Sequence, residues 1–179
     1  MDSKGRHGLS CKKSAGRHSR HGAINDIVQR ALTTVGYQAI REPPGIDRGN
    51  GKRPDGMTRI PWREGKPLLW DATVVDTVCQ SYIGSTSQEA GTAAEKAEGR
   101  KMEKYADFAA NFKFVPLGFE TCGSWGSEAL ALVKTIGKKL SDQTGENRST
   151  SFLTQSISIE LQRGNASSVL GTFPFTRDL

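Results

Sequence analysis

This chain of 179 residues has few cysteines, no long apolar run and no apolar segment at the start of the sequence. The three cysteines, Cys11, Cys79 and Cys122, are an odd number and lie far apart, which argues against a disulfide framework. No run approaches the roughly 20 apolar residues that cross a bilayer, and the basic N-terminus has no apolar signal core. We therefore expect an intracellular protein with no membrane partner.

Composition otherwise resembles that of a globular protein, with 35% apolar and 25% charged residues, enough for one modest core. The charge is uneven, because residues 1–20 carry a net +5 and the other 159 residues a net +1. A basic arm on a nearly neutral body favours contact with a phosphate backbone, and a solubilising tail is the alternative. The residues expected to make such contacts are Lys12, Lys13, Arg17, Arg20, Lys52 and Arg53.

Hydrophobic periodicity and turn residues predict a mixed α/β domain. Residues 1–17, rich in Gly, Ser and Lys, are expected to form a loop or arm, as are residues 46–53 and 77–86. A capping-box pattern at 86–89 predicts the start of a long helix. The predicted elements are, in order, helix 23–35, strands 37–42, 57–62 and 68–75, a helix from 86 to about 110, strand 113–119, and helices 127–140 and 150 to about 164.

The strands 57–62 and 68–75 should form a hairpin around a turn at Glu64-Gly65. In that register Asp71 faces Thr58, and Asp55 lies about three positions away at the mouth of the hairpin. A bend at Gly56 would bring the two acids together. Both faces of 68–75 are mainly apolar, which predicts a central strand, whereas Pro116 predicts that strand 113–119 is an edge strand or bulged.

Asp55 and Asp71 are the strongest candidates for a functional site. A carboxylate inside an apolar strand is costly to bury unless it is paired, protonated or bound to a metal, and Asp71 lies in such a strand. Asp55 lies between Pro54 and Gly56, which also suits an ordinary turn. Two carboxylates plus substrate oxygens are a common way to hold Mg²⁺, and a divalent cation promotes the cleavage of phosphodiesters.

Pro54-Asp55, a second acid followed by Ala72-Thr73 on the next strand, and basic residues on the following helix resemble the PD-(D/E)XK nuclease superfamily. More specifically, the chain resembles the restriction-endonuclease-like domain at the C-terminal end of non-LTR retrotransposon polyproteins. Order and spacing carry this resemblance, because none of its short motifs is specific alone. The matching stretches are 7–11, 20–21 with 25–26, 42–43, 53–56, 70–74, 81–82, 101–105 and 114–120.

The resemblance implies a restriction-endonuclease-like αβββαβ core with additional C-terminal helices. The endonuclease-like domain would span residues 20–168, after a basic arm at 1–19 and before a tail at 169–179. Asp55 and Asp71 would bind Mg²⁺ or Mn²⁺. The lysine usually found two residues after the second acid is replaced by Thr73, so the helix 86–110 would supply it.

Lys101 is the first candidate for that lysine and Lys104 the second, and Tyr105 would help to hold the phosphate. From the sequence alone these lysines also suit a solvated helix face. Thr73, His21 and Asp26 are possible accessory residues. A histidine on the apolar side of a helix, such as His21, is more often packed or hydrogen-bonded than catalytic.

His7 and Cys11 have the spacing of the second half of a Cys-Cys-His-Cys zinc knuckle, which precedes the nuclease domain in this family. Two ligands do not make a stable structural zinc site, so Zn²⁺ is not expected in this chain. Either the knuckle has been lost or the chain is a fragment of a longer reading frame. His18 and His21 could complete a set of four ligands as a further alternative.

The function implied is that of a metal-dependent DNA endonuclease domain that nicks target DNA, so that the new 3′ hydroxyl primes reverse transcription. The reverse transcriptase and the element RNA would be supplied elsewhere, and the expected location is the nucleus. The alternative is a catalytically silent, DNA-binding remnant of a retroelement polyprotein. A translated fragment without a cellular role is the third possibility.

Overall fold

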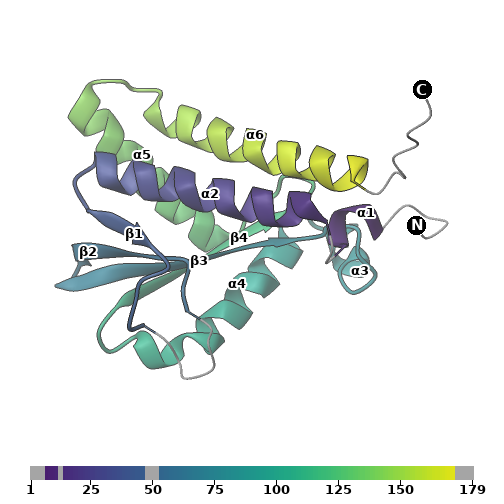
Figure 1. Ribbon diagram of the computed structural model, residues 1–179, viewed down its shortest axis with the longest axis horizontal. Coiled ribbons are helices and arrows are strands. Elements are labelled where there is room, and N and C mark those ends of the chain that lie inside the picture. Colours follow the sequence, from purple (N-terminus) through teal and green to yellow (C-terminus); the bar gives the residue numbers. More distant parts are fainter. Residues whose placement is uncertain (1–6, 12–13, 47–52, 172–179) are drawn as a thin grey trace.

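The computed structural model describes residues 7–11, 14–46 and 53–171, and a four-stranded sheet lies at its centre (Figure 1). The sheet order is the sequence order, with the first three strands antiparallel and the fourth parallel to the third. The strands are β1 (Ala39–Arg41), β2 (Gly56–Arg63), β3 (Lys66–Val75) and β4 (Lys113–Glu120).

Helices cover both faces of the sheet. Figure 1 shows α2 and α5 on one side, α6 lying along α2, and α4 on the opposite side. Because α4 connects the parallel strands β3 and β4, it is the crossover between them. The helices are α1 (His7–Ser10), α2 (Ala15–Thr34), α3 (Ile83–Thr86), α4 (Thr92–Lys104), a short 3₁₀ helix (Ala106–Phe108), α5 (Ser127–Thr144) and α6 (Ser149–Leu170).

The predicted mixed α/β class is confirmed, and so is the order of a helix, three strands, a helix and a strand. β3 is an inner strand buried on both faces, as predicted, and β4 with its Pro116 is an edge strand. Leu68 and Trp70 face the main core under α2 and α5, whereas Leu69 packs in a smaller cluster on the α4 side. Within the described ranges, no helix has both the length and the hydropathy needed to cross a membrane.

The N-terminal residues differ from the predicted loop. Residues 7–10 form α1, and α2 begins at Ala15 rather than Ala23. A contact distant in sequence explains this early start. A Cβ atom at Gly16 would lie only 2.5 Å from the backbone oxygen of Gly164 on α6, so the first turn of α2 rests directly on that helix. Local sequence patterns cannot reveal a contact of this kind.

The limits of the later helices also differ from the prediction. The capping-box pattern at 86–89 does not start α4, because a short helix occupies 83–86 and α4 runs only from Thr92 to Lys104. The carboxylate of Glu120 on β4 accepts hydrogen bonds from the backbone N–H groups of Ala93 and Ala94, at 2.9 and 3.3 Å. The first turn of α4 is therefore capped by a distant strand. At the C-terminus, α6 continues to Leu170, beyond the predicted end near Gly164.

A buried carboxylate also links α4 to α5. Glu98 is 3% exposed and accepts hydrogen bonds from the N–H groups of Gly118, Glu128 and Ala129, at 2.9, 3.0 and 3.0 Å. Burial raises the pKa of the Glu98 carboxyl, and these donors only partly oppose that rise. Glu98 and Glu120 together fix α4 against β4 and the start of α5.

The hairpin register differs from the prediction, and this difference brings the two acids together. Near the turn Arg63 pairs with Lys66, as predicted, but two irregularities shift the register until Gly56 pairs with Trp70. The prediction that Asp71 faces Thr58 is therefore wrong. The Thr58 hydroxyl instead accepts a hydrogen bond from the N–H of Leu68 and donates one to the oxygen of Ile60, both at 2.9 Å, inside the irregular segment.

The contact between Gly56 and Trp70 predicts a large effect for one added methyl group. A Cβ atom at Gly56 would lie 2.0 Å from the Trp70 ring, so Gly56→Ala should lower the free energy of unfolding by about 1–3 kcal/mol. Gly99→Ala on α4 is the matched control, because nothing lies within 4 Å of its Cβ position, and it should stabilise the protein by up to about 1 kcal/mol. Urea denaturation measures both, and equal effects would contradict the packing argument.

Candidate active site

Asp55 lies immediately before β2, and two structural elements hold its carboxylate. Oδ2 accepts hydrogen bonds from the N–H of Ala72 on β3, at 2.7 Å, and from Nδ2 of Asn25 on α2, at 3.1 Å. Oδ1 lies 3.1 Å from Nε2 of His21, also on α2. The side chain is only 18% exposed. Asp55 therefore joins the first helix to the central strand.

These contacts determine the ionisation of Asp55. Burial alone would raise its pKa, but the hydrogen bond and charge of His21 and the donors Ala72 and Asn25 together lower the pKa below 3.8. The carboxylate is therefore ionised at neutral pH although most of it is buried. An ionised, oriented carboxylate is the form that a hard cation requires.

Asn25 is a site residue that the sequence analysis did not select. It is fully buried on α2, accepts a hydrogen bond from the Trp70 indole at 2.9 Å and donates one to Asp55. Asn25 thus links the Asp55 carboxylate to Trp70, which is fixed in the core. The available signal was an amide three residues before Val28, on the apolar side of the helix.

Asp71 extends toward α4, on the other side of the sheet from Trp70. Its Oδ1 atom lies 2.5 Å from Nζ of Lys101, and its Oδ2 atom accepts a hydrogen bond of 2.6 Å from the Tyr105 hydroxyl. Nζ of Lys104 lies 4.0 Å from Oδ2. The side chain of Asp71 is 6% exposed. Lys101 is therefore the lysine in direct contact with the acid, and Lys104 lies farther away.

Tyr105 contacts the acid rather than open solvent. It is 1% exposed, its hydroxyl donates a hydrogen bond to Asp71, and it accepts a hydrogen bond of 2.8 Å from Lys104. It also packs on Phe114, with ring centroids 4.6 Å apart. The geometry makes Tyr105 a residue that positions Asp71, whereas the sequence analysis expected it to hold a phosphate.

Both acids open onto one groove of about 360 Å³. Gly56 pairs with Trp70, so the residue before it, Asp55, comes opposite the residue after Trp70, Asp71. The groove lies at this position. It combines acidic and basic side chains, as expected of a site that binds both a cation and a polyanion. The lining residues are His21, Glu42, Arg53, Pro54, Asp55, Asp71, Ala72, Lys101 and Lys104.

The donor set of the groove suits Mg²⁺ or Mn²⁺. Both cations take carboxylate oxygens and complete their shells with water and substrate oxygens. Within the described part of the chain, no group of three or more His, Cys, Asp and Glu side chains is placed to hold a metal. At the groove, Asp55 and Asp71 are carboxylates that could contribute ligands to a cation. Lys101 contacts Asp71 at this groove. Glu42 is paired with Arg53, at 2.5 Å.

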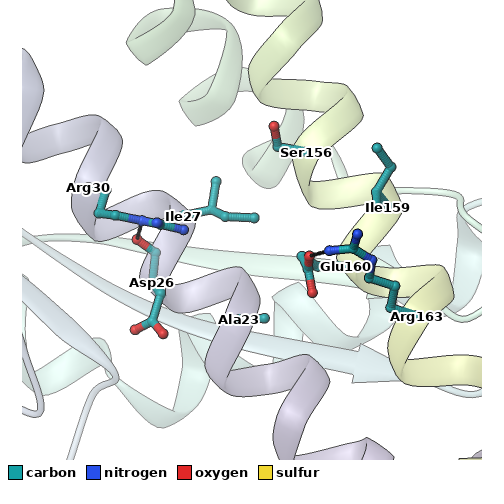
Figure 2. A pocket seen from close by; sticks show the side chains of 8 residues that line it. All are labelled: Ala23, Asp26, Ile27, Arg30, Ser156, Ile159, Glu160 and Arg163. Atoms are coloured by element: carbon teal, nitrogen blue, oxygen red, sulfur yellow. Dashed lines mark hydrogen bonds and ion pairs between the residues drawn. The ribbon is translucent and has the colours of Figure 1, made fainter. Parts of the chain in front are cut away.

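Asp26 does not belong to this groove. It is exposed on α2, forms an ion pair with Arg41 and lines a separate cavity of about 570 Å³ between α2 and α6. Figure 2 shows that cavity, with Asp26 and Arg30 on one wall and Glu160 and Arg163 on the other. Thr73 is also outside the groove and lines the cleft next to it.

The remaining predicted residues are only partly described. Lys12, Lys13 and Lys52 lie outside the described residues. His7 begins α1, and Cys11 follows that helix as a free thiol, so the predicted zinc remnant stays a prediction. The predicted DNA contacts that are described lie around the groove and the cleft beside it, and they are Arg17, Arg20 and Arg53.

Comparison with known proteins gives no further guide, because no protein-family model and no curated protein matches this chain. Any function must therefore be argued from the groove itself. Its distinctive property is a pair of mostly buried acids, each held by donors from a helix.

The lowered pKa of Asp55 predicts how its contribution to stability depends on pH. Because the pKa of Asp55 is lower in the folded state, its ionised carboxylate stabilises the fold at pH values above about 3.8, the pKa of the unfolded state. This stabilisation is lost as the pH falls through the folded pKa. The stability difference between wild type and Asp55→Asn should therefore shrink on acidification from about pH 6 to below the folded pKa. Urea denaturation across that range measures it, with Asp142→Asn on the exposed side of α5 as control. A difference independent of pH would contradict the assignment.

Proposed function

We propose that this chain is a divalent-metal-dependent DNA endonuclease domain that nicks one strand of target DNA. The observation that carries the proposal is the shared groove, where Asp55 and Asp71 lie together and Lys101 contacts Asp71 at 2.5 Å. The element order of a helix, three strands, a helix and a strand supports a restriction-endonuclease-like core of the PD-(D/E)XK kind.

The proposal assigns roles to the acids and to several residues at or beside the groove. Asp55 and Asp71 hold Mg²⁺ or Mn²⁺, which offsets charge on the phosphate and lowers the pKa of a bound water. Lys101 orients the attacking water or stabilises the charge that develops on the phosphate. Tyr105 positions Asp71, and His21 positions Asp55. Arg53 and Lys104 lie at the groove, where they attract the DNA backbone.

The proposed biological role is the first step of retrotransposon insertion. A nick leaves a 3′ hydroxyl, from which a reverse transcriptase supplied elsewhere would copy the element RNA. The support for this role is the order of motifs along the chain, together with the placement of Asp55 and Asp71 at one groove. DNA in the nucleus is then the substrate.

A catalytically silent DNA-binding domain is the second candidate, and two observations favour it. Lys101 and Tyr105 already satisfy Asp71, so the cluster is stable without a cation. In addition, Thr73 occupies the usual lysine position and faces another cleft. Such a domain would keep the basic surfaces and bind DNA in a salt-dependent way without cutting it.

Nicking of supercoiled plasmid in Mg²⁺ or Mn²⁺ tests the proposed activity. Asp55→Asn and Asp71→Asn should reduce nicking to background, because each removes one anionic ligand. Asp142→Asn should leave the rate unchanged, since its side chain lies exposed on α5. Equal nicking by wild type and by the two site variants would reject the proposal.

Lys101→Met distinguishes an active enzyme from a silent binding domain. We expect nicking to fall on the order of 100-fold, because the lysine acts on the charge of the transition state. Lys96→Met is the matched control, since Lys96 lies on the same helix but contacts Ser85, at 3.0 Å, away from the groove. Plasmid nicking and gel-shift binding are measured together. Wild-type binding without any nicking would select the silent domain.

A further inference from the structure

A second cleft, of about 260 Å³, adjoins the groove on the side of the first helix. Three residues line both cavities, namely His21, Ala72 and Lys101. The cleft extends from them along the N-terminal half of α2 and the final part of β3. Its further lining residues are Arg17, His18, Arg20, Thr73 and Val74.

The charge of this cleft differs from that of the groove. All of its lining residues are described, and none of them is acidic, whereas Asp55 and Asp71 line the groove. Arg17 and His18 line the cleft and are exposed, so the charge of Arg17 reaches an incoming ligand. The cleft therefore suits an anion and is a poor site for a cation.

Arg20 is a built-in part of this cleft and not a mobile surface side chain. It is 2% exposed, its Nη1 atom donates a hydrogen bond to Oδ1 of Asn165, and its buried Nε atom has no partner. No carboxylate is hydrogen-bonded to it in the described part of the chain, although the charge of Asp76 acts on it. Arg20 lines the cleft without a hydrogen-bonded carboxylate, so its guanidinium contributes positive charge to the cleft wall.

The packing around Arg20 keeps that guanidinium in place. A Cβ atom at Gly164 would lie 2.3 Å from Cβ of Arg20, so the glycine allows α6 to approach. Asn165 is itself anchored, because its Nδ2 atom donates a hydrogen bond of 2.7 Å to the oxygen of Thr121. The arginine is thus positioned before any ligand arrives, which lowers the entropy cost of binding.

We propose that this cleft binds a backbone phosphate of the DNA strand, adjacent to the phosphate at the Asp55–Asp71 groove. The inference rests on the proposed function and adds the path of the strand, which runs from the groove along α2. Lys101 lies at the junction and contacts both positions. Thr73 contributes a hydroxyl to the adjacent phosphate, so the residue in the usual lysine position acquires a binding role.

DNA binding without metal tests the cleft separately from cutting. Fluorescence anisotropy of a labelled duplex of about 20 base pairs is measured in EDTA from about 50 to 300 mM NaCl. The slope of log K against log salt is negative, and Arg17→Gln should reduce its magnitude by roughly 1, because one phosphate contact is lost. Thr73→Val should weaken binding several-fold with the slope unchanged, since it removes a neutral donor. Lys134→Gln, exposed on α5, is the charge-matched control.

The outcomes separate the two proposals. An unchanged slope for Arg17→Gln, or an equal loss for Lys134→Gln, would overturn the phosphate cleft even if wild type nicks DNA and Asp55→Asn does not. The phosphate cleft would be supported if Arg17→Gln reduces the magnitude of the slope, Lys134→Gln does not, and Thr73→Val weakens binding. This holds even if neither the wild type nor any variant nicks plasmid. Thermal unfolding of each variant verifies that the fold is retained.

Discussion

The shifted register of the β2–β3 hairpin is the constraint on which the candidate site depends. Without the irregularities between Met57 and Arg63, Asp71 would face Thr58, and Asp55 would lie about three positions away from Asp71. With them, Asp55 comes opposite Asp71, and its carboxylate reaches the N–H of Ala72. The Thr58 hydroxyl and the close contact of Gly56 with Trp70 stabilise the shifted register, so side chains on the core side determine geometry on the functional side.

Charge in the groove is balanced without a ligand, and this balance is what makes two mostly buried acids compatible with a stable fold. Asp55 is held by His21, Asn25 and a backbone N–H, and Asp71 is held by Lys101 and Tyr105. An ionised acid left unpaired in such a place would cost several kcal/mol, by order of magnitude. The donors therefore hold the two acids in a fixed orientation.

Much of this fold could be predicted from the sequence, because periodic apolar residues define β3, α2 and α5. The need of Asp71 for a partner was predictable for the same reason, since a carboxylate in an apolar strand is costly to bury unpaired, and Lys101 and Tyr105 contact it. The hairpin register, the start of α2 and the start of α4 could not be predicted, because each depends on a contact distant in sequence. The Gly16–Gly164 approach and the Glu120 cap are such contacts, and the role of Asn25 likewise required knowing where Trp70 lies.

The two buried glutamates have a consequence for how the groove comes into existence. Every residue proposed to act in the groove lies between His21 and Tyr105, yet α4 begins at a cap supplied by Glu120 and is tied through Glu98 to the start of α5. During synthesis, the acids and Lys101 would therefore emerge well before the segments that set their relative positions. A nascent chain ending after Tyr105 would contain all of these chemical groups without their arrangement. The site is assembled only once β4 has joined the sheet and α5 has packed against it.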